Sequence, residues 1–273
     1  MEEIVSAKWL KDNLNSPDLI ILDTSLKSSI DGKHASSDKL TIPGSRFFDL
    51  KGVFHDKENS FPNTVPRANY FETECRKLGI NNQSKIVVFD KFGIYSSPRV
   101  WWLFKVMGHE TVAVLNGGLP LWIESGYPTI KEFSDDGSEG DFTAKYNPEL
   151  VVDFTAIEKN TGQRDFLIVD ARSEGRFNGI TEEPRVHLQS GHIPNSVNIP
   201  YQEVLRDNQF KPKEELNELF SSKCAGEENL VFSCGSGLTA CIIMLASLRA
   251  YSKSKRVYDG SWTEWAELNE LYK

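Results

Sequence analysis

The sequence repeats one pattern of strands and turns, and this repetition is the strongest constraint on how the chain can fold. IVVFD (86–90) parallels NLVFS (229–233), and NGGLPLW (116–122) parallels DGSWTEW (259–265). The phenylalanine and the last tryptophan of each pair are 33 residues apart in both halves. An offset of 143 residues fits both of these segments, and we interpret the repetition as an internal duplication.

Further pairs of segments indicate which elements are repeated. LIILDTSL (19–26) and FLIVDARS (166–173) are apolar runs that lead into an acid, as expected of buried parallel strands. TIPGSRFFDL (41–50) and HIPNSVNIPY (192–201) each combine an Ile-Pro turn with a short strand. Both copies therefore contain these two strands.

Helical patterns alternate with these strands, for example at 96–109 and 239–250. Such alternation predicts an α/β fold, in which each copy has a parallel sheet flanked by helices. The polar, glycine-bearing stretch between the copies lacks a sustained apolar period, which is typical of a linker. We expect a domain at 1–130, a linker at 131–150 and a second domain at 151–273.

Charge and hydropathy exclude several classes of partner. The formal net charge is −8, so nucleic acid and anionic membranes would be repelled on average. No apolar run approaches the roughly 20 residues that span a bilayer. The start, MEEIVSAKWL, resembles neither a signal peptide nor a transit peptide. We therefore expect a cytoplasmic protein that binds neither nucleic acid nor membrane.

The chain has four cysteines, and their spacing contains no CxxC motif. A reducing compartment would keep them as thiols, and neither a disulfide nor a metal site is expected. Cys75 and Cys224 lie in polar settings and are expected to be accessible, whereas Cys241, on an apolar helix, is expected to be buried.

Cys234 ends the apolar run LVFS and precedes a glycine-rich loop and a helix. Backbone N–H groups and the positive end of the helix dipole converge there, which favours the reactive thiolate. The alternative is a small buried residue at a strand end. At the same place in the first half stands Lys91, so a nucleophile at Cys234 would confine the chemistry to the second half.

Two other loop types share part of this sequence pattern. Residues 235–240 fit G-x-G-x-x-A, and Asp259 lies 19 residues beyond Ala240, as in a dinucleotide-binding fold. That fingerprint normally follows the first strand of its domain, whereas this one follows a late strand. A phosphatase loop would need an arginine at position 240, where this chain has Ala240.

The loop CGSGLTA resembles the active loop of the mercaptopyruvate sulfurtransferases, a branch of the tandem rhodanese family. The likeness continues through DARSEGRF, EEPR, SGHIPNSVNIP, FFDL, SSPRVWW, LNGG and YDGSWTEW, in the family's order. It implies two rhodanese-like domains, of which the second is catalytic. The thiosulfate branch carries basic residues after the cysteine, where this chain has the neutral Gly235 and Ser236.

The resemblance also implies a reaction, which requires no cofactor. Cys234 would take sulfur from 3-mercaptopyruvate as a persulfide, releasing pyruvate, and then pass the sulfur to a thiol such as thioredoxin, or to cyanide. Thiosulfate as the donor, or a persulfide carrier with little turnover, remain alternatives.

The family's substrate arginines match Arg176 and Arg185, whose planar forks suit a carboxylate. Arg172 is either a further substrate residue or a structural one that holds the loop by an ion pair. Ser236 would take a polar role in catalysis. Backbone N–H groups that hold the substrate would come from Gly235, Gly237, Leu238 and Thr239.

One departure from the family concerns the proton relay. The branch pairs the serine and the aspartate of FFD, here Asp49, with a histidine from the first half. This chain has Asn63 at that histidine's place, in FPNTVP. Because asparagine cannot shuttle a proton near neutral pH, the relay of Ser236, Asp49 and a histidine is expected to be incomplete.

Overall fold

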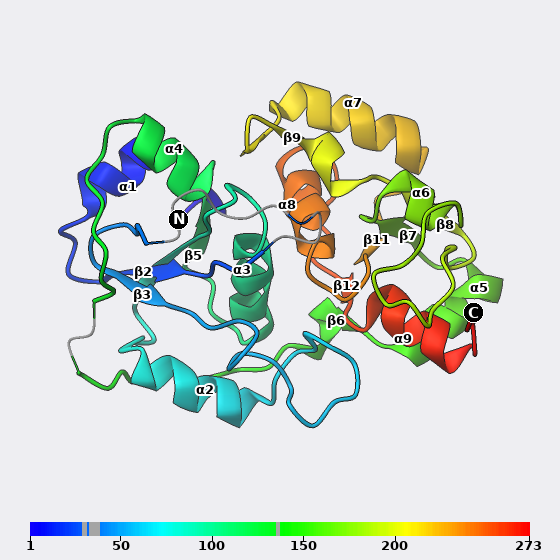
Figure 1. The fold of residues 1–273 in the computed structure, drawn as a ribbon, viewed down its shortest axis with the longest axis horizontal. Helices are drawn as coiled ribbons and strands as arrows, with labels where there is room; N and C mark the ends of the chain where they lie inside the picture. The colour runs from blue at the N-terminus through cyan, green and yellow to red at the C-terminus, as the bar shows by residue number, and fades with distance from the viewer. Residues whose placement is uncertain (29–31, 33–38, 135–136) are drawn as a thin grey trace. The chain divides into compact units, whose positions relative to one another are not determined.

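A computed structural model describes residues 1–28, 32, 39–134 and 137–273 (Figure 1). The chain packs as two compact units, and each of them includes a short segment from the other half of the sequence. Unit 1 comprises Met1–Asp56, Val65–Asn147 and Asp207–Phe210. Unit 2 comprises Lys57–Thr64, Pro148–Arg206 and Lys211–Lys273.

Unit 1 contains a parallel sheet of five strands in the order β1-β5-β4-β2-β3. In that order the strands are Ile4–Val5, Val112–Leu115, Lys85–Phe89, Leu19–Asp23 and Ser45–Phe47. The central strand β4 is buried from Ile86 to Phe89. Burial on both faces explains why such strands have nearly continuous apolar sequences.

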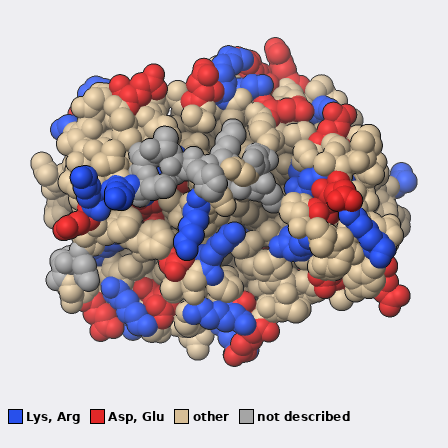
Figure 2. Space-filling view, viewed as in Figure 1, with Lys and Arg blue, Asp and Glu red and all other residues tan. Residues whose placement is uncertain are grey.

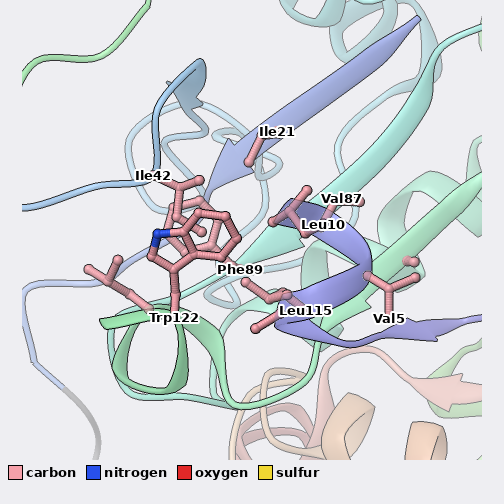
Figure 3. Packing of buried hydrophobic residues seen from close by; sticks show 11 residues of the cluster. Val5, Leu10, Ile21, Ile42, Val87, Phe89, Leu115 and Trp122 are labelled. Carbon is pink, nitrogen blue, oxygen red and sulfur yellow. The ribbon is translucent and has the colours of Figure 1, made fainter. Parts of the chain in front are cut away.

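Helices cover both faces of this sheet. They are α1 (Ala7–Asn13), α2 (Ala68–Lys77), α3 (Ser97–Val106) and α4 (Gly118–Glu124). Alternate residues of the strands pack against α1 and α4, where Trp122 and Leu10 meet Val87 and Phe89 (Figure 3). On the other side, the ring of Phe71 in α2 contacts that of Phe104 in α3 at 5.3 Å between centroids.

Unit 2 repeats the arrangement, with strand order β6-β12-β11-β7-β8, again parallel throughout. In that order the strands are Val151–Val152, Val257–Tyr258, Leu230–Ser233, Leu167–Asp170 and Ser196–Asn198. Both units place corresponding strands in the same order, as expected of a duplication.

The helices of unit 2 also lie on two faces (Figure 1). Ile168 and Val231 pack with residues of α5 and α9, including Ile157 and Trp262. On the other face, α8 contacts β11 and α7. The helices are α5 (Phe154–Gln163), α6 (Glu174–Phe177), α7 (Lys213–Cys224), α8 (Ala240–Ala250) and α9 (Ser261–Leu268). Shorter elements are η1 (Pro148–Leu150), η2 (Tyr201–Val204), β9 (Leu205–Arg206) and β10 (Gln209–Phe210).

The predicted class of two tandem α/β domains is confirmed. β2 lies within the apolar run 19–26, β7 within the run 166–173, and α3 and α8 within the helical patterns at 96–109 and 239–250. Within the stretch expected as a linker, Phe142 is buried against Phe71 of unit 1, and its N–H donates to Ile80 O at 3.1 Å. This part of the stretch is thus packed against a domain.

Charged side chains of both signs are interspersed over the face drawn in Figure 2. That distribution fits the modest negative net charge of the chain. No helix within the described residues has the length and apolar character required to cross a bilayer.

Candidate functional site

Cys234 directly follows β11, the central strand of the unit 2 sheet, and lies at the carboxyl end of that strand. Its residue surface is only 1 % exposed. The loop 235–239 leads from it into α8, so the positive end of the helix dipole lies close to the loop. Such a setting can hold a negatively charged group beside the sulfur.

The start of α9 holds the cysteine loop in place through Ser261. The Ser261 Oγ accepts hydrogen bonds from the N–H groups of Cys234 and Gly237, both at 3.1 Å, and donates to Tyr258 O at 2.9 Å. The φ of Ser261 is 53°, in the left-handed region that non-glycine residues rarely adopt. Its partner in unit 1 is Gly118, whose φ is 52°. The backbone conformation is thus repeated, and only the side chain differs.

The next two residues of α9 bind carbonyl groups of the same loop. The Trp262 N–H donates to Cys234 O at 2.9 Å. Thr263 donates to Gly235 O from its N–H at 3.1 Å and from its Oγ1 at 2.6 Å. With their carbonyls occupied, Cys234 and Gly235 are held in one conformation.

Four N–H groups of the loop remain available to an anion. Those of Gly235, Ser236, Leu238 and Thr239 donate to no acceptor among the described residues. The N–H of Gly237, which the sequence analysis assigned to substrate binding, is already taken by Ser261. The φ of Gly237 is 77°, so glycine is needed at this position for its backbone conformation.

The corresponding loop in unit 1 is filled by its own carboxylate. Asp90 Oδ2 accepts hydrogen bonds from the N–H groups of Tyr95, Ser96 and Ser97 at 2.8 to 3.0 Å. In unit 2 the equivalent residue is Ser233, whose buried Oγ has no partner among the described residues. Unit 1 thus contains an internal anion at a place where unit 2 has none.

Asn63 reaches this loop in the structure, as part of unit 2. Its Nδ2 donates to Ser236 Oγ at 2.9 Å and to Ser236 O at 3.2 Å. The φ of Asn63 is 62°, a left-handed conformation that asparagine tolerates better than most residues. Because Ser236 Oγ accepts from the amide, its own proton is available to donate towards a bound molecule.

Arg172 is buried and makes structural contacts. Its Nε and Nη2 bond the carboxylate of Asp170 at 2.7 to 3.1 Å, and its Nη1 donates to Glu183 Oε1 at 2.7 Å. Nη2 also donates to Gly191 O, and the guanidinium lies 4.4 Å from the ring centroid of Trp262. Burial opposes its charge, but the two carboxylates outweigh burial and raise the pKa of Arg172.

Arg176 lies against the cysteine loop and is held by Glu183. Its Nη2 donates to Glu183 Oε2 at 2.6 Å and its Nε to Oε1 at 3.2 Å. A Cβ at Gly235 would be only 2.9 Å from Nη2 of Arg176. Gly235 therefore allows the guanidinium to approach the loop.

Arg185 is a half-buried cation whose side chain makes no hydrogen bond or ion pair within the described part of the chain. Burial lowers the pKa of its guanidinium, and this effect is opposed by the charge of Glu183. Arg185 also interacts electrostatically with Arg176 and Cys234. Among the described residues, Arg185 is thus the cation of this cluster without a hydrogen bond or ion pair to its side chain.

The remaining site residues predicted from sequence are placed as follows. Leu238 and Thr239 are buried, with 8 % and 7 % of their surface exposed. Asp49 belongs to unit 1, where its Oδ1 accepts a hydrogen bond from the Gly52 N–H at 2.8 Å. A role for Asp49 beside Ser236 stays a prediction.

The expectation that Cys75 and Cys224 are accessible is wrong. They are 0 % and 1 % exposed, because each occupies an inward-facing position of an amphipathic helix. Burial raises the pKa of Cys75 well above its usual value and that of Cys224 to about 12. Cys241 is buried, as predicted, and its Sγ lies 3.5 Å from Gly237 O. Cys75 and Cys224 are thus poorly suited to nucleophilic chemistry.

Two residues that shape the site were missed in the sequence analysis, namely Ser261 and Glu183. The offset of 143 pairs Ser261 with Gly118, so a serine at a glycine position was a detectable signal. Glu183 lies in the EPR segment, where only the arginine was considered.

Comparisons with known proteins identify the family. The profile of the rhodanese-like domain matches residues 6–125 and 154–268. A protein of Arabidopsis thaliana named thiosulfate/3-mercaptopyruvate sulfurtransferase 1, mitochondrial, is 37% identical, over 99% of this chain and 77% of its own length. The 3-mercaptopyruvate sulfurtransferase of Escherichia coli K12 is 33% identical, over 98% of this chain and 96% of its own.

Solved structures agree with the sequence comparison. SseA from Escherichia coli, described as a 3-mercaptopyruvate sulfotransferase with the rhodanese fold, superposes with a TM-score of 0.84. It is 31% identical, and the match covers 96% of this chain and 99% of SseA. On this evidence of sequence and fold, the chain belongs to the rhodanese-like family and carries the family's domain twice.

Proposed function

We propose that this chain is a sulfurtransferase that moves the sulfur of 3-mercaptopyruvate to a thiol acceptor through a persulfide on Cys234. The observation that carries the proposal is the loop of unit 2. Its cysteine lies at the end of the central strand, beside N–H groups that no described residue accepts, whereas the unit 1 loop is filled by Asp90. The relatives named above for this activity support the choice of donor.

In the first half of the reaction, the Cys234 thiolate attacks the sulfur of 3-mercaptopyruvate. A sulfur–sulfur bond forms, and the carbon–sulfur bond breaks with its electron pair moving to carbon. The leaving group is the enolate of pyruvate, which takes up a proton to give pyruvate. Negative charge therefore grows on the donor's oxygens in the transition state, and fixed donors nearby accelerate the step.

Arg176 and Arg185 differ in how freely they can bind the negatively charged oxygens of the donor. Arg176 is already bonded to Glu183 through two of its nitrogens, which leaves its Nη1 edge for a substrate. Arg185 has no such partner within the described residues, and its burial makes an anionic ligand favourable. We therefore assign the donor carboxylate chiefly to Arg185, with Arg176 as the second contact.

Ser236 and Asn63 would act on the donor's carbonyl or sulfur. Asn63 donates two hydrogen bonds to Ser236, which orients the hydroxyl. Because an amide does not titrate near neutral pH, the proton for the enolate would come from water or from the donor's own thiol. A slower reaction than one with a complete relay is expected.

In the second half, the thiolate of an acceptor attacks the outer sulfur of the persulfide and regenerates Cys234. We propose a reduced thioredoxin-type dithiol as the acceptor and the cytoplasm as the compartment, in line with the free cysteines of the chain. Recovery of the native protein with the cytosolic fraction, rather than with organelles, would test the compartment.

The function is tested by incubating the purified protein with 3-mercaptopyruvate and reduced thioredoxin, and by measuring pyruvate with a coupled dehydrogenase. Cys234→Ser should abolish pyruvate release, whereas Cys75→Ala, at a buried thiol of unit 1, should retain it. Equal release by the Cys234→Ser protein would refute the proposal. A parallel assay with thiosulfate tests the alternative donor. If the intact-mass spectrum after donor treatment shows one added sulfur on Cys234 that acceptors do not remove, the protein would be a persulfide carrier.

A further inference from the structure

Glu183 is a buried carboxylate that is shared by two arginines of the site. Its side chain is 2 % exposed, and its Oε1 accepts from Arg172 Nη1 at 2.7 Å and from Arg176 Nε at 3.2 Å. Its Oε2 accepts from Arg176 Nη2 at 2.6 Å. Because both oxygens are used, the carboxylate fixes the position of Arg176 relative to the loop of Gly235.

The charges around the cysteine loop nearly cancel because of Glu183. Arg172 and Arg176 are balanced by Asp170 and Glu183, which bond them directly. Arg185 is then the one cation of this cluster without an ion pair in the described ranges. Apart from the Cys234 thiolate itself, and with Glu267 acting on Arg185 only through its charge, the described side chains of the cluster therefore present one cation without an ion pair to a ligand.

A site with a single positive charge favours a donor with one negative charge over a donor with two. The carboxylate of 3-mercaptopyruvate carries one negative charge, whereas thiosulfate is a dianion that needs a second cation to offset its loss of hydration. We propose that Glu183 is a positioning residue that sets this discrimination, because it neutralises and aims Arg176 and so makes the site selective for a monoanionic donor. The inference rests on the proposed function of Cys234 as a sulfur-accepting nucleophile.

The test uses Glu183→Gln, which keeps the shape of the side chain and removes its charge. Arg176 then becomes a second uncompensated cation, so kcat/KM for thiosulfate relative to 3-mercaptopyruvate should rise by about tenfold. The matched control is Glu182→Gln, because Glu182 is 80% exposed and pairs with Lys273 at the surface. This control should change the ratio by less than about twofold. An equal ratio in all three proteins overturns the inference.

The glutamine variant leaves two buried cations without their shared partner and is therefore less stable. Glu183→Asp provides a second test, because it keeps the charge but is one methylene too short to hold both arginines. We expect KM for both donors to rise about fivefold while their ratio stays within about twofold of the wild type. A wild-type KM in the aspartate variant would overturn the positioning role.

A third measurement does not depend on any sulfur donor. Additional positive charge near Cys234 favours its thiolate, so alkylation by the neutral reagent iodoacetamide at pH 7 should be about fivefold faster in Glu183→Gln. Peptide mass spectrometry separates Cys234 from the three other buried cysteines. If the wild type transfers sulfur from neither donor, the proposed function fails but this measurement still applies. Equal alkylation rates overturn the inference about Glu183.

Discussion

Replacing Ser261 should reverse the usual order of stability between alanine and glycine variants. Ser261 combines an unfavourable φ of 53° with a hydroxyl that accepts hydrogen bonds from two buried N–H groups and donates to Tyr258 O. Alanine loses these hydrogen bonds and keeps the backbone strain. Glycine loses the same bonds but removes the strain, since it has no Cβ.

The magnitudes follow from these contacts. Leaving the N–H groups of Cys234 and Gly237 without an acceptor costs about 1–3 kcal/mol each, and partial relaxation of the loop reduces the sum to about 3 kcal/mol. Because glycine adopts the left-handed conformation without strain, the free energy of unfolding of the glycine variant should be about 1 kcal/mol higher than that of the alanine variant. For a unit of this size, the melting temperature should fall by roughly 10 °C with alanine and by about 6–7 °C with glycine.

Thermal unfolding followed by tryptophan fluorescence measures this difference, because Trp262 and Trp265 lie in the helix that begins at Ser261. The mirror substitution in unit 1, Gly118→Ala, places a Cβ against the carbonyl oxygen of Asp90 and should also destabilise. The reasoning would be refuted by a Ser261→Ala protein that is as stable as Ser261→Gly.

Two further predictions concern titratable positions. Asn63→His should raise kcat and make the rate depend on pH near 6.5, because imidazole can carry the proton that the amide cannot. Steady-state kinetics with 3-mercaptopyruvate between pH 5.5 and 8 will measure both effects. An unchanged pH–rate profile would contradict the role of position 63. His109 is buried, and burial lowers the pKa of its imidazole. The folded state therefore binds fewer protons than the unfolded state, so this contribution to stability is present above about pH 6.5 and is lost as the pH falls below it. The decrease in melting temperature from pH 7.5 to 5.5 should be smaller in His109→Gln, and an equal decrease would argue against His109 as its source.

The repeated strands could be predicted from sequence because their physical requirements are local. LIILD and LIVD are buried on both faces, so an apolar run is the only composition that these strands tolerate. The acids that end them are buried as well, and Asp23 and Asp170 bond residues of their own loops. The order of the strands within each sheet was not predicted from the sequence and comes from the structure.

The site was predicted less completely, because its contacts join segments with no fixed spacing. Asn63 and Ser236 are 173 positions apart, and only the family resemblance, not the residues of FPNTVP, associated this segment with the second unit. Glu183 and Arg172 are joined by an irregular loop, whose sequence has no helical or strand periodicity from which their contact could be predicted. The arginines were noticed because of the family resemblance, but the carboxylate that compensates them becomes visible only in three dimensions.

The short segments that the two units exchange determine how far the halves are separable. Lys57–Thr64 is encoded within the first repeat but packs with unit 2, and it contains Asn63. A protein cut anywhere between 131 and 150 would yield a C-terminal piece that retains Cys234 and lacks the donor to Ser236. The first repeat, although its own loop is filled by Asp90, thus contributes a residue that the second cannot supply. A gene encoding the second repeat alone would not encode the whole site, which gives selection a reason to keep both copies in one reading frame.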